Sequence, residues 1–250
     1  MDQDAALWDA WAATYNEDSL GPAEPVAVVL AELADGGPAL ELCIGMGRVA
    51  LPLAGQGVPV MGLDVSTEML RRLEERRGAL PVDYRVRDMG DFEPPGRYPL
   101  VYIVAGTFYL LADDDRQRSC LRSCSRVLDE GGHVVIEAPV PGSSALPLES
   151  GVIPRGVGEE WGKLSIVMHE PGPQLLHTQE GRLVPEGARM RLVSRRYVHL
   201  RELDDMAGGA GLRLAARYSG WDRAPFEDGQ ARHISVYSVS GELGGRFGDG

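Results

Sequence analysis

Residues 39–70 read ALELCIGMGRVALPLAGQGVPVMGLDVSTEML, and they carry the clearest indication of the fold. Two apolar runs, at 39–44 and 58–65, stand on either side of a segment with the pattern of a helix. Gly45 and Gly47 follow the first run, and glycines let the backbone turn tightly where a strand passes into a helix. The stretch therefore predicts a strand, a glycine-rich turn, a helix and a second strand, which is the opening unit of a parallel sheet.

The alternation of strands and helices continues as far as residue 140. Nearly continuous apolar strands are typical of a parallel sheet whose two faces are both covered by helices. We therefore expect an α/β fold with a doubly wound, mostly parallel, seven-stranded sheet. Further strands are expected at 82–88, 100–106 and 133–140, and helices at 67–77 and 113–128.

The pattern changes after Pro141, where residues 142–163 are rich in Gly, Ser and Pro. Three later runs alternate like antiparallel strands, at 164–170, 174–184 and 188–200. A short helix follows, and two last strands are expected to form an antiparallel hairpin at the sheet edge. We expect a single domain of five parts, namely an N-terminal helical cap (1–36), a cofactor-binding core (37–140), an inserted antiparallel β lid over the substrate (141–195), C-terminal strands that complete the sheet (196–240) and a mobile tail (241–250).

Composition excludes several classes of partner. The formal net charge is −12 and the pI is near 4.9, so a polyanion is repelled and no nucleic-acid partner is expected. The N-terminus lacks the apolar segment of a signal peptide, and no apolar run is long enough to cross a bilayer. The three cysteines form no disulfide framework and no metal-ligand spacing. We expect a cytoplasmic monomer or homodimer without metal or membrane partner.

Acidic residues stand where the first three strands end or are about to end. Glu41 lies inside the first strand, where a carboxylate would repel a pyrophosphate but suits a ligand with a cationic amino-acid head. Asp64 ends the second strand, a position from which it can accept hydrogen bonds from ribose hydroxyls. Asp88 and Met89 end the third, where an acid can accept an adenine amino proton while the methionine packs on the ring. In an open parallel sheet these ends face one crevice.

With these features the chain resembles the class I S-adenosylmethionine-dependent methyltransferases, especially a bacterial small-molecule group in which ELxxGTGR precedes an ALPLA helix and a GLDxSxxML turn. Three stretches carry the resemblance, namely 39–70, WDAWAATYN at 8–16 and RYVHLRELDDMAGGAGLRL at 196–214. The resemblance covers most of 7–140 and 196–239, and it is weak over 141–195. The chain departs from the group at Cys43, where many members have glycine, at Met46 and at Trp8.

The resemblance implies S-adenosylmethionine as the cofactor. Ala105 and Gly106 are expected near the transferred methyl, and Tyr15 is expected to fold over the cofactor. The implied cofactor-binding residues are Tyr15, Glu41, Gly45, Met46, Gly47, Asp64, Val65, Met69, Asp88, Met89, Ala105 and Gly106.

The expected reaction is an in-line transfer of the methyl to an oxygen or nitrogen of a small molecule, such as a natural-product or sugar intermediate. His169 on the lid is the first candidate catalytic residue, followed by Tyr109 and Glu137, and each has a purely structural alternative. Two other functions stay open. The Gly-x-Gly-x-x-Ala turn also fits an NAD-dependent oxidoreductase, and Met46 leaves open a regulator that binds the cofactor without catalysis.

Overall fold

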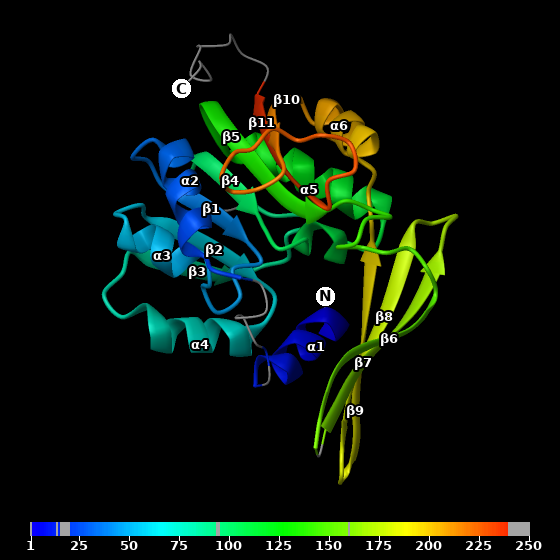
Figure 1. Cartoon of the computed structure of the whole chain (residues 1–250). Helices are drawn as coiled ribbons and strands as arrows, with labels where there is room; N and C mark the ends of the chain where they lie inside the picture. Colours follow the sequence, from blue (N-terminus) through cyan, green and yellow to red (C-terminus); the bar gives the residue numbers. More distant parts are fainter. Residues whose placement is uncertain (1, 14, 16–20, 94–95, 160, 240–250) are drawn as a thin grey trace.

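The computed structural model describes residues 2–13, 15, 21–93, 96–159 and 161–239 (Figure 1). Seven strands form one sheet in the order β10-β11-β5-β4-β1-β2-β3. The strands are β1 (Ala39–Leu42), β2 (Val60–Asp64), β3 (Val82–Val86), β4 (Tyr98–Ile103), β5 (Leu128–Pro139), β10 (Leu212–Tyr218) and β11 (Arg232–Val239). The pairs among β1 to β5 are parallel, whereas β11 is antiparallel to both β5 and β10. This confirms the predicted seven-stranded sheet and its C-terminal edge hairpin.

Helices cover both faces of this sheet and bury two apolar clusters. One cluster joins α5 and α6 to the side of the strands that carries Leu40 and Leu42. The other joins α2, α3 and α4 to the opposite side, which carries Ala39 and Tyr102. The helices are α1 (Asp2–Ala12), α2 (Glu24–Ala34), α3 (Ala50–Gly55), α4 (Thr67–Arg77), α5 (Asp114–Val127), α6 (Leu200–Gly209) and the short 3-10 helix η2 (Thr107–Leu110).

Local sequence explains where these helices begin and end. The side chain of Ser66 accepts the backbone N–H of Met69 at 3.1 Å and so caps α4. Gly78, with φ of 54°, ends the same helix. Pro52 falls in the first turn of α3, where its missing N–H does no harm. Each of these positions is predicted by the sequence.

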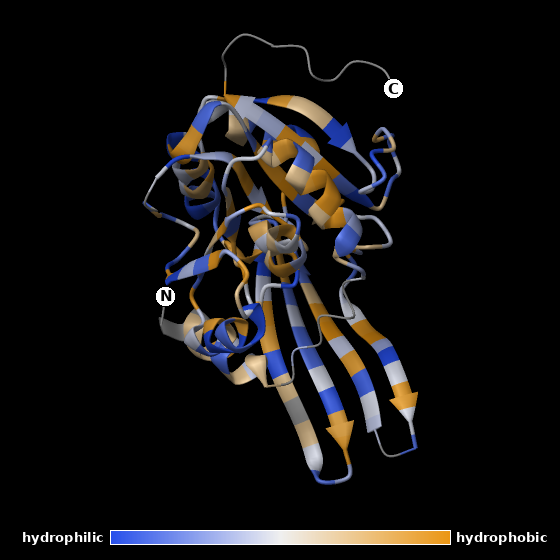
Figure 2. Cartoon of the chain, turned by 90° about the vertical axis from the view of Figure 1, so that its left-hand side faces the viewer, coloured by the Kyte–Doolittle hydropathy of each residue, from blue (hydrophilic) through white to orange (hydrophobic). Residues whose placement is uncertain are grey.

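Four antiparallel strands form a second sheet, called the lid below, in the order β6-β7-β8-β9. They are β6 (Gly151–Gly158), β7 (Trp161–Glu170), β8 (Leu175–Val184) and β9 (Gly187–Arg196). Figure 2 shows these strands projecting from the α/β layers with alternating hydrophilic and hydrophobic residues. The predicted antiparallel sheet is confirmed, but β6 is not predicted. It is an edge strand, which tolerates Pro154 and a bulge beside it, so its sequence looks like a loop.

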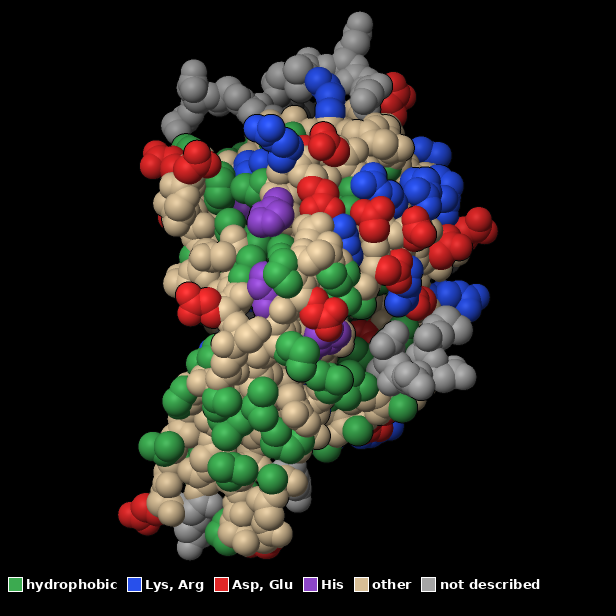
Figure 3. All heavy atoms as spheres, turned by 90° about the vertical axis from the view of Figure 1, so that its right-hand side faces the viewer, with side chains coloured by type: hydrophobic (Ala, Val, Ile, Leu, Met, Phe, Trp, Pro, Cys, Tyr) green, Lys and Arg blue, Asp and Glu red, His purple; other side chains and the backbone are tan. Residues whose placement is uncertain are grey.

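The face of the lid that is turned outward is apolar. Figure 3 shows hydrophobic side chains gathered over the lower part of the molecule, where the lid lies. Met168 is 58% exposed and Leu192 is 53% exposed, and both alternate with residues whose side chains are buried. The lid therefore has an outer face and an inner face, and only the inner one packs toward the α/β core.

The structure divides the segment predicted as one N-terminal cap. α1 packs against α4, as expected for a cap. The prediction is wrong for α2, because Val26, Ala27 and Leu30 of this helix are part of the core beneath the sheet. The expected mobile tail, 241–250, lies outside the described residues. In the described part of the chain, no helix combines the length and apolar character that crossing a bilayer requires.

Candidate cofactor and acceptor site

The turn after β1 places three residues in the left-handed region of φ. They are Cys43 at 60°, Gly45 at 56° and Gly47 at 82°. A Cβ on Gly47 would lie 2.5 Å from Cδ1 of Leu73, so this glycine is required by the packing of α4. A Cβ on Gly45 would meet no atom within 4 Å. Gly45 therefore presents bare backbone to open space, which suits the close approach of a ligand.

Asp64 at the end of β2 is almost completely buried, and its carboxylate is held by backbone N–H groups. One oxygen accepts from Gly45 at 2.8 Å, and the other accepts from Ser66 at 2.9 Å. Burial raises the pKa of Asp64, while hydrogen bonds from the backbone of Ser66, Gly45 and Val65 oppose the rise. Each oxygen keeps a second lone pair, so the carboxylate can also accept two hydroxyls, as a ribose requires.

Asp88 and Met89 lie where β3 leaves the sheet. The carboxylate of Asp88 accepts the backbone N–H of Gly90 at 2.7 Å and a guanidinium N–H of Arg116 at 2.5 Å. The side chain of Met89 is buried, and the thiol of Cys43 donates to its sulfur at 3.3 Å. Met89 thus joins the turn after β1 to the end of β3.

Three carboxylates surround the thiol of Cys43. Burial raises the pKa of this thiol, and the charges of Asp64, Asp88 and Glu41 raise it further, against an opposing contribution from Arg116. Glu41 is buried, and the hydroxyl of Tyr102 donates to its carboxylate at 2.9 Å. The turn therefore lies in a negative potential, which favours a ligand with cationic groups and disfavours a pyrophosphate.

Ala105 and Gly106 form a second left-handed turn, after β4. Their φ values are 58° and 70°, and the backbone N–H of Ala105 donates to the carboxylate of Glu137 at 2.8 Å. The N–H of Gly106 donates to the backbone carbonyl of Glu137 at 3.0 Å. A left-handed alanine costs about 1–2 kcal/mol. Residues with a strained backbone thus follow the neighbouring strands β1 and β4. Backbone strain of this kind is common at functional sites.

The N-terminal segment covers the turn after β1. Tyr15 and Trp8 pack on a small apolar cluster that contains Met46 and Met69. This places the predicted residues Tyr15, Met46 and Met69 side by side.

Hydrogen bonds between Asp9 of α1 and the start of α4, which the sequence does not predict, hold α1 in this position. The carboxylate of Asp9 accepts from the hydroxyl of Ser66 at 2.6 Å and from the backbone N–H of Glu68 at 3.0 Å. These two hydrogen bonds lower the pKa of Asp9. The only sequence signal is that Asp9 lies within the WDAWAATYN stretch.

The three candidate catalytic residues have different partners in the structure. Tyr109 is buried, and its hydroxyl lies 3.1 Å from the carbonyl oxygens of both Pro139 and Val198. These hydrogen bonds tie β5 to the segment before α6, and burial raises the pKa of Tyr109; its catalytic role stays a prediction. Glu137 lies near the carboxyl end of β5, between β11 and β4, and its carboxylate is bound to the N–H of Ala105. His169 is on the inner face of the lid, where Nε2 lies 2.9 Å from the hydroxyl of Tyr197; its catalytic role stays a prediction.

Among the described residues, no group of three or more His, Cys, Asp or Glu side chains could hold a metal ion. The three cysteines are free thiols.

Comparisons with known proteins agree with this geometry. The family model for a methyltransferase domain matches residues 39–132. The cypemycin N-terminal methyltransferase of a Streptomyces species is 28% identical over 107 residues, which cover 43% of this chain and 44% of that relative. The match thus spans less than half the length of the relative.

Solved structures extend the similarity to nearly the whole chain. The CcbJ methyltransferase from Streptomyces caelestis is 29% identical, with a TM-score of 0.86 over 95% of this chain and 98% of that one. The sugar N-methyltransferase KedS8 from a Streptoalloteichus species is 20% identical, with a TM-score of 0.69 over 93% of both chains. At this lower identity the second likeness concerns the fold.

Proposed function

We propose that this chain, which belongs to the class I S-adenosylmethionine-dependent methyltransferases, methylates an amine nitrogen of a small natural-product-like acceptor, such as an aminosugar. Its cofactor is S-adenosylmethionine. The observation that carries the proposal is the grouping of carboxylates at the turn after β1, where Asp64 accepts the N–H of Gly45 at 2.8 Å and Glu41 and Asp88 lie near Cys43. These carboxylates suit a cofactor with an ammonium and a sulfonium. They disfavour the NAD-dependent alternative, because they would repel the pyrophosphate of that cofactor.

In this proposal each end of the parallel strands holds one part of the cofactor. Gly45 gives room beside its backbone for the methionine part, Asp64 accepts the ribose hydroxyls, and Asp88 with Met89 receives the adenine. When bound, S-adenosylmethionine supplies a methyl group made electrophilic by its positively charged sulfur. The Ala105–Gly106 turn, fixed by Glu137, would form the wall beside that methyl.

The choice of nitrogen over oxygen follows from the state of the candidate bases. A hydroxyl acceptor needs a base to take its proton, whereas an amine that arrives neutral already has its lone pair. Tyr109 is bonded to backbone carbonyls and Glu137 is bonded to Ala105. His169, the third candidate, lies with Nε2 2.9 Å from the hydroxyl of Tyr197, so each candidate base already has a partner within the protein. Positioning is then the main contribution of the protein. The cypemycin enzyme, whose name specifies an N-terminus, supports the same choice.

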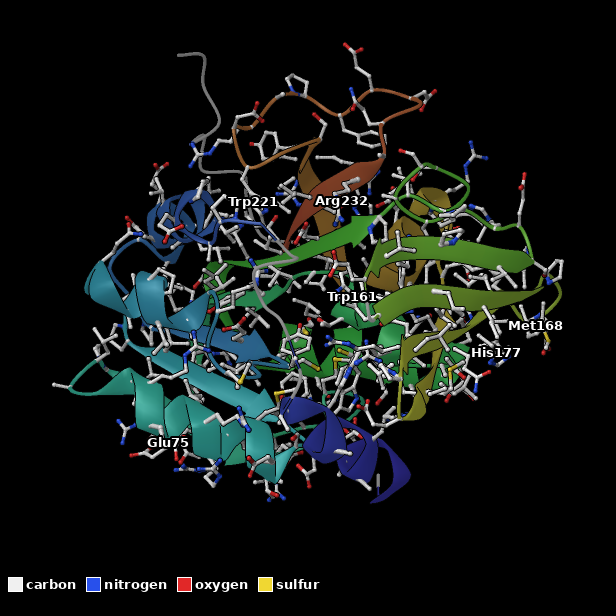
Figure 4. The ribbon with its side chains drawn as sticks, turned by 60° about the horizontal axis from the view of Figure 1, so that its bottom comes forward. Glu75, Trp161, Met168, His177, Trp221 and Arg232 are labelled. Atoms are coloured by element: carbon white, nitrogen blue, oxygen red, sulfur yellow. The ribbon has the colours of Figure 1, made fainter. Side chains whose placement is uncertain are left out.

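Two elements would close over the acceptor and exclude water. α1 carries Tyr15 toward the turn after β1, and the ring of Trp11 lies against the guanidinium of Arg191 on the lid. Figure 4 shows α1 beside the lid strands, as does Figure 1. We further propose a cytoplasmic monomer or homodimer that has no nucleic-acid partner and in which residues 141–195 act as the substrate lid.

The test is release of S-adenosylhomocysteine with matched panels of amine and hydroxyl acceptors, with mass spectrometry to locate the methyl. We expect turnover with amines only, at a rate that rises with pH through the pKa of the acceptor amine. Methylation of oxygen would contradict the choice of nitrogen. Cofactor binding without turnover on either panel would favour a regulator, and binding of NADH in place of both adenosyl ligands would favour an oxidoreductase.

A further inference from the structure

We propose that the inner face of the lid binds an anionic group of the acceptor, a carboxylate or a phosphate, through Arg195 and Arg191. The inference rests on the proposed methyl transfer, because it assigns the acceptor of that reaction an acidic substituent beside its amine.

The register of the lid places both arginines on the inner face. Across the β8–β9 pair, Leu176 faces Arg195 and Glu180 faces Arg191. Leu176 is buried, and so is Val193, which lies between the two arginines on the same side of β9. Leu192, on the other side, is exposed. Arg191 and Arg195 therefore project toward the α/β core.

Arg191 lies against α1, and both arginines are close enough to Tyr15 to interact with it electrostatically. The guanidinium of Arg191 lies over the ring of Trp11. β9 itself packs against η2, the short helix that follows the Ala105–Gly106 turn. The strand that carries the two arginines therefore lies next to the turn proposed to hold the transferred methyl, and the acceptor must bind beside that methyl.

The local charges are out of balance. The carboxylate of Glu180 pairs with Arg191. Within the described residues, Nε of Arg191 is buried without an acceptor, and the guanidinium of Arg195 has neither a hydrogen bond nor an ion pair. Burial lowers the pKa of both side chains. Glu180 is thus the carboxylate that acts on both guanidinium groups, and one carboxylate balances only one of the two cations.

An anion on the acceptor would balance the other cation. A guanidinium presents its donors in a planar fork that matches the two oxygens of a carboxylate or phosphate. The chain as a whole carries a net charge of −12. A cationic pair on the inner face is therefore a local exception that would draw an acidic acceptor into an otherwise repelling protein.

The experiment is calorimetric titration of inorganic phosphate, and separately of acetate, into the protein saturated with S-adenosylhomocysteine. The variants are Arg195→Gln, which removes the charge, and Arg195→Lys, which keeps it. Arg201→Gln is the matched control, because Arg201 is an exposed arginine of α6. Affinity for S-adenosylhomocysteine checks that each variant is folded.

We expect at least one anion to bind, with an affinity that falls at least tenfold in Arg195→Gln, less than that in Arg195→Lys, and not at all in Arg201→Gln. Binding of phosphate alone would assign a phosphorylated acceptor, and binding of acetate alone a carboxylated one. Two results would overturn the anionic subsite while the methyltransferase function stands. In the first, S-adenosylhomocysteine binds but neither anion does. In the second, the affinity for the anion is the same in Arg195→Gln as in the native chain. If S-adenosylhomocysteine itself fails to bind the native chain, both proposals fall.

Discussion

The carboxylate of Asp64 accepts the backbone N–H of Gly45 at 2.8 Å, across 19 residues of sequence. Its other oxygen accepts the N–H of Ser66, the residue that caps α4. One side chain therefore fixes the turn after β1 to the first turn of the helix after β2. Because each oxygen has a further lone pair, the same carboxylate can shape the site and bind a ligand in it.

Substitution Asp64→Ala is expected to weaken binding of S-adenosylhomocysteine at least tenfold, which is about 1.4 kcal/mol. The variant loses the acceptors for the ribose and also frees the Gly45 turn. Calorimetry measures the effect, with Asp83→Ala as the control because Asp83 is an exposed acid on the neighbouring strand β3. Equal affinity in native chain and Asp64→Ala would remove Asp64 from the ligand-binding residues.

The two glycines of the turn after β1 are expected to respond differently to alanine. Gly45→Ala meets no neighbour, so the free energy of unfolding should fall only by the left-handed penalty of about 1–2 kcal/mol. Cofactor affinity should fall strongly, because the new methyl enters the open space. Gly47→Ala also drives its Cβ into Leu73, which is fully buried, and should lose roughly 2–4 kcal/mol of unfolding free energy.

Urea unfolding and calorimetry on both variants separate these effects. If Gly45→Ala bound S-adenosylhomocysteine as tightly as the native chain, the space beside Gly45 would not be the methionine site.

The regular elements could be predicted because their signals are local. The apolar runs of the parallel strands, Ser66 as a cap and Gly78 as a stop each depend on a few neighbouring residues. The acids at the strand ends could be predicted for a similar reason, since parallel strands bring their ends to one edge. The sequence thus indicated the end of the strands at which these acids gather.

What the sequence did not reveal depends on contacts between distant segments. β6 exists because it pairs with β7, although its own residues read as a loop. The hydroxyl of Tyr109 contacts the carbonyl oxygens of Pro139 and Val198, which are 30 and 89 residues away. Asp9 reaches Ser66 across 57 residues. No periodicity in a single sequence reports such pairings.

Substitution of Glu137 distinguishes two roles for this residue, namely holding the Ala105–Gly106 turn in place and acting as a general base. In Glu137→Gln one side-chain oxygen remains to accept the N–H of Ala105, so a residue that only holds the turn should retain activity within about threefold. A general base would lose roughly 100-fold or more. We expect the small effect in Glu137→Gln and a larger one in Glu137→Ala, measured as kcat for the amine acceptor. A 100-fold loss in Glu137→Gln would make Glu137 catalytic.

His233 makes the stability of the fold depend on pH. It is buried in β11, where Nδ1 lies 2.9 Å from the hydroxyl of Ser235, while within the described residues Nε2 has no partner. Burial, with a smaller contribution from the charge of Arg217, lowers its pKa from 6.5 to about 3. The folded chain therefore keeps His233 neutral at pH values at which the unfolded chain already binds a proton there.

The sign of the effect follows from this difference. The stabilising contribution is fully present above pH 6.5 and is lost as the pH falls from 6.5 toward 3, because only the unfolded state gains the proton. Between about pH 7.5 and 5.5 the loss should be about 1.4 kcal/mol in urea unfolding. The comparison is with His233→Asn, whose amide can still reach Ser235 but does not titrate. The other titrating groups are shared by the two proteins, so the difference between their pH profiles isolates His233, and parallel profiles would show that the imidazole is protonated equally in the folded and unfolded states.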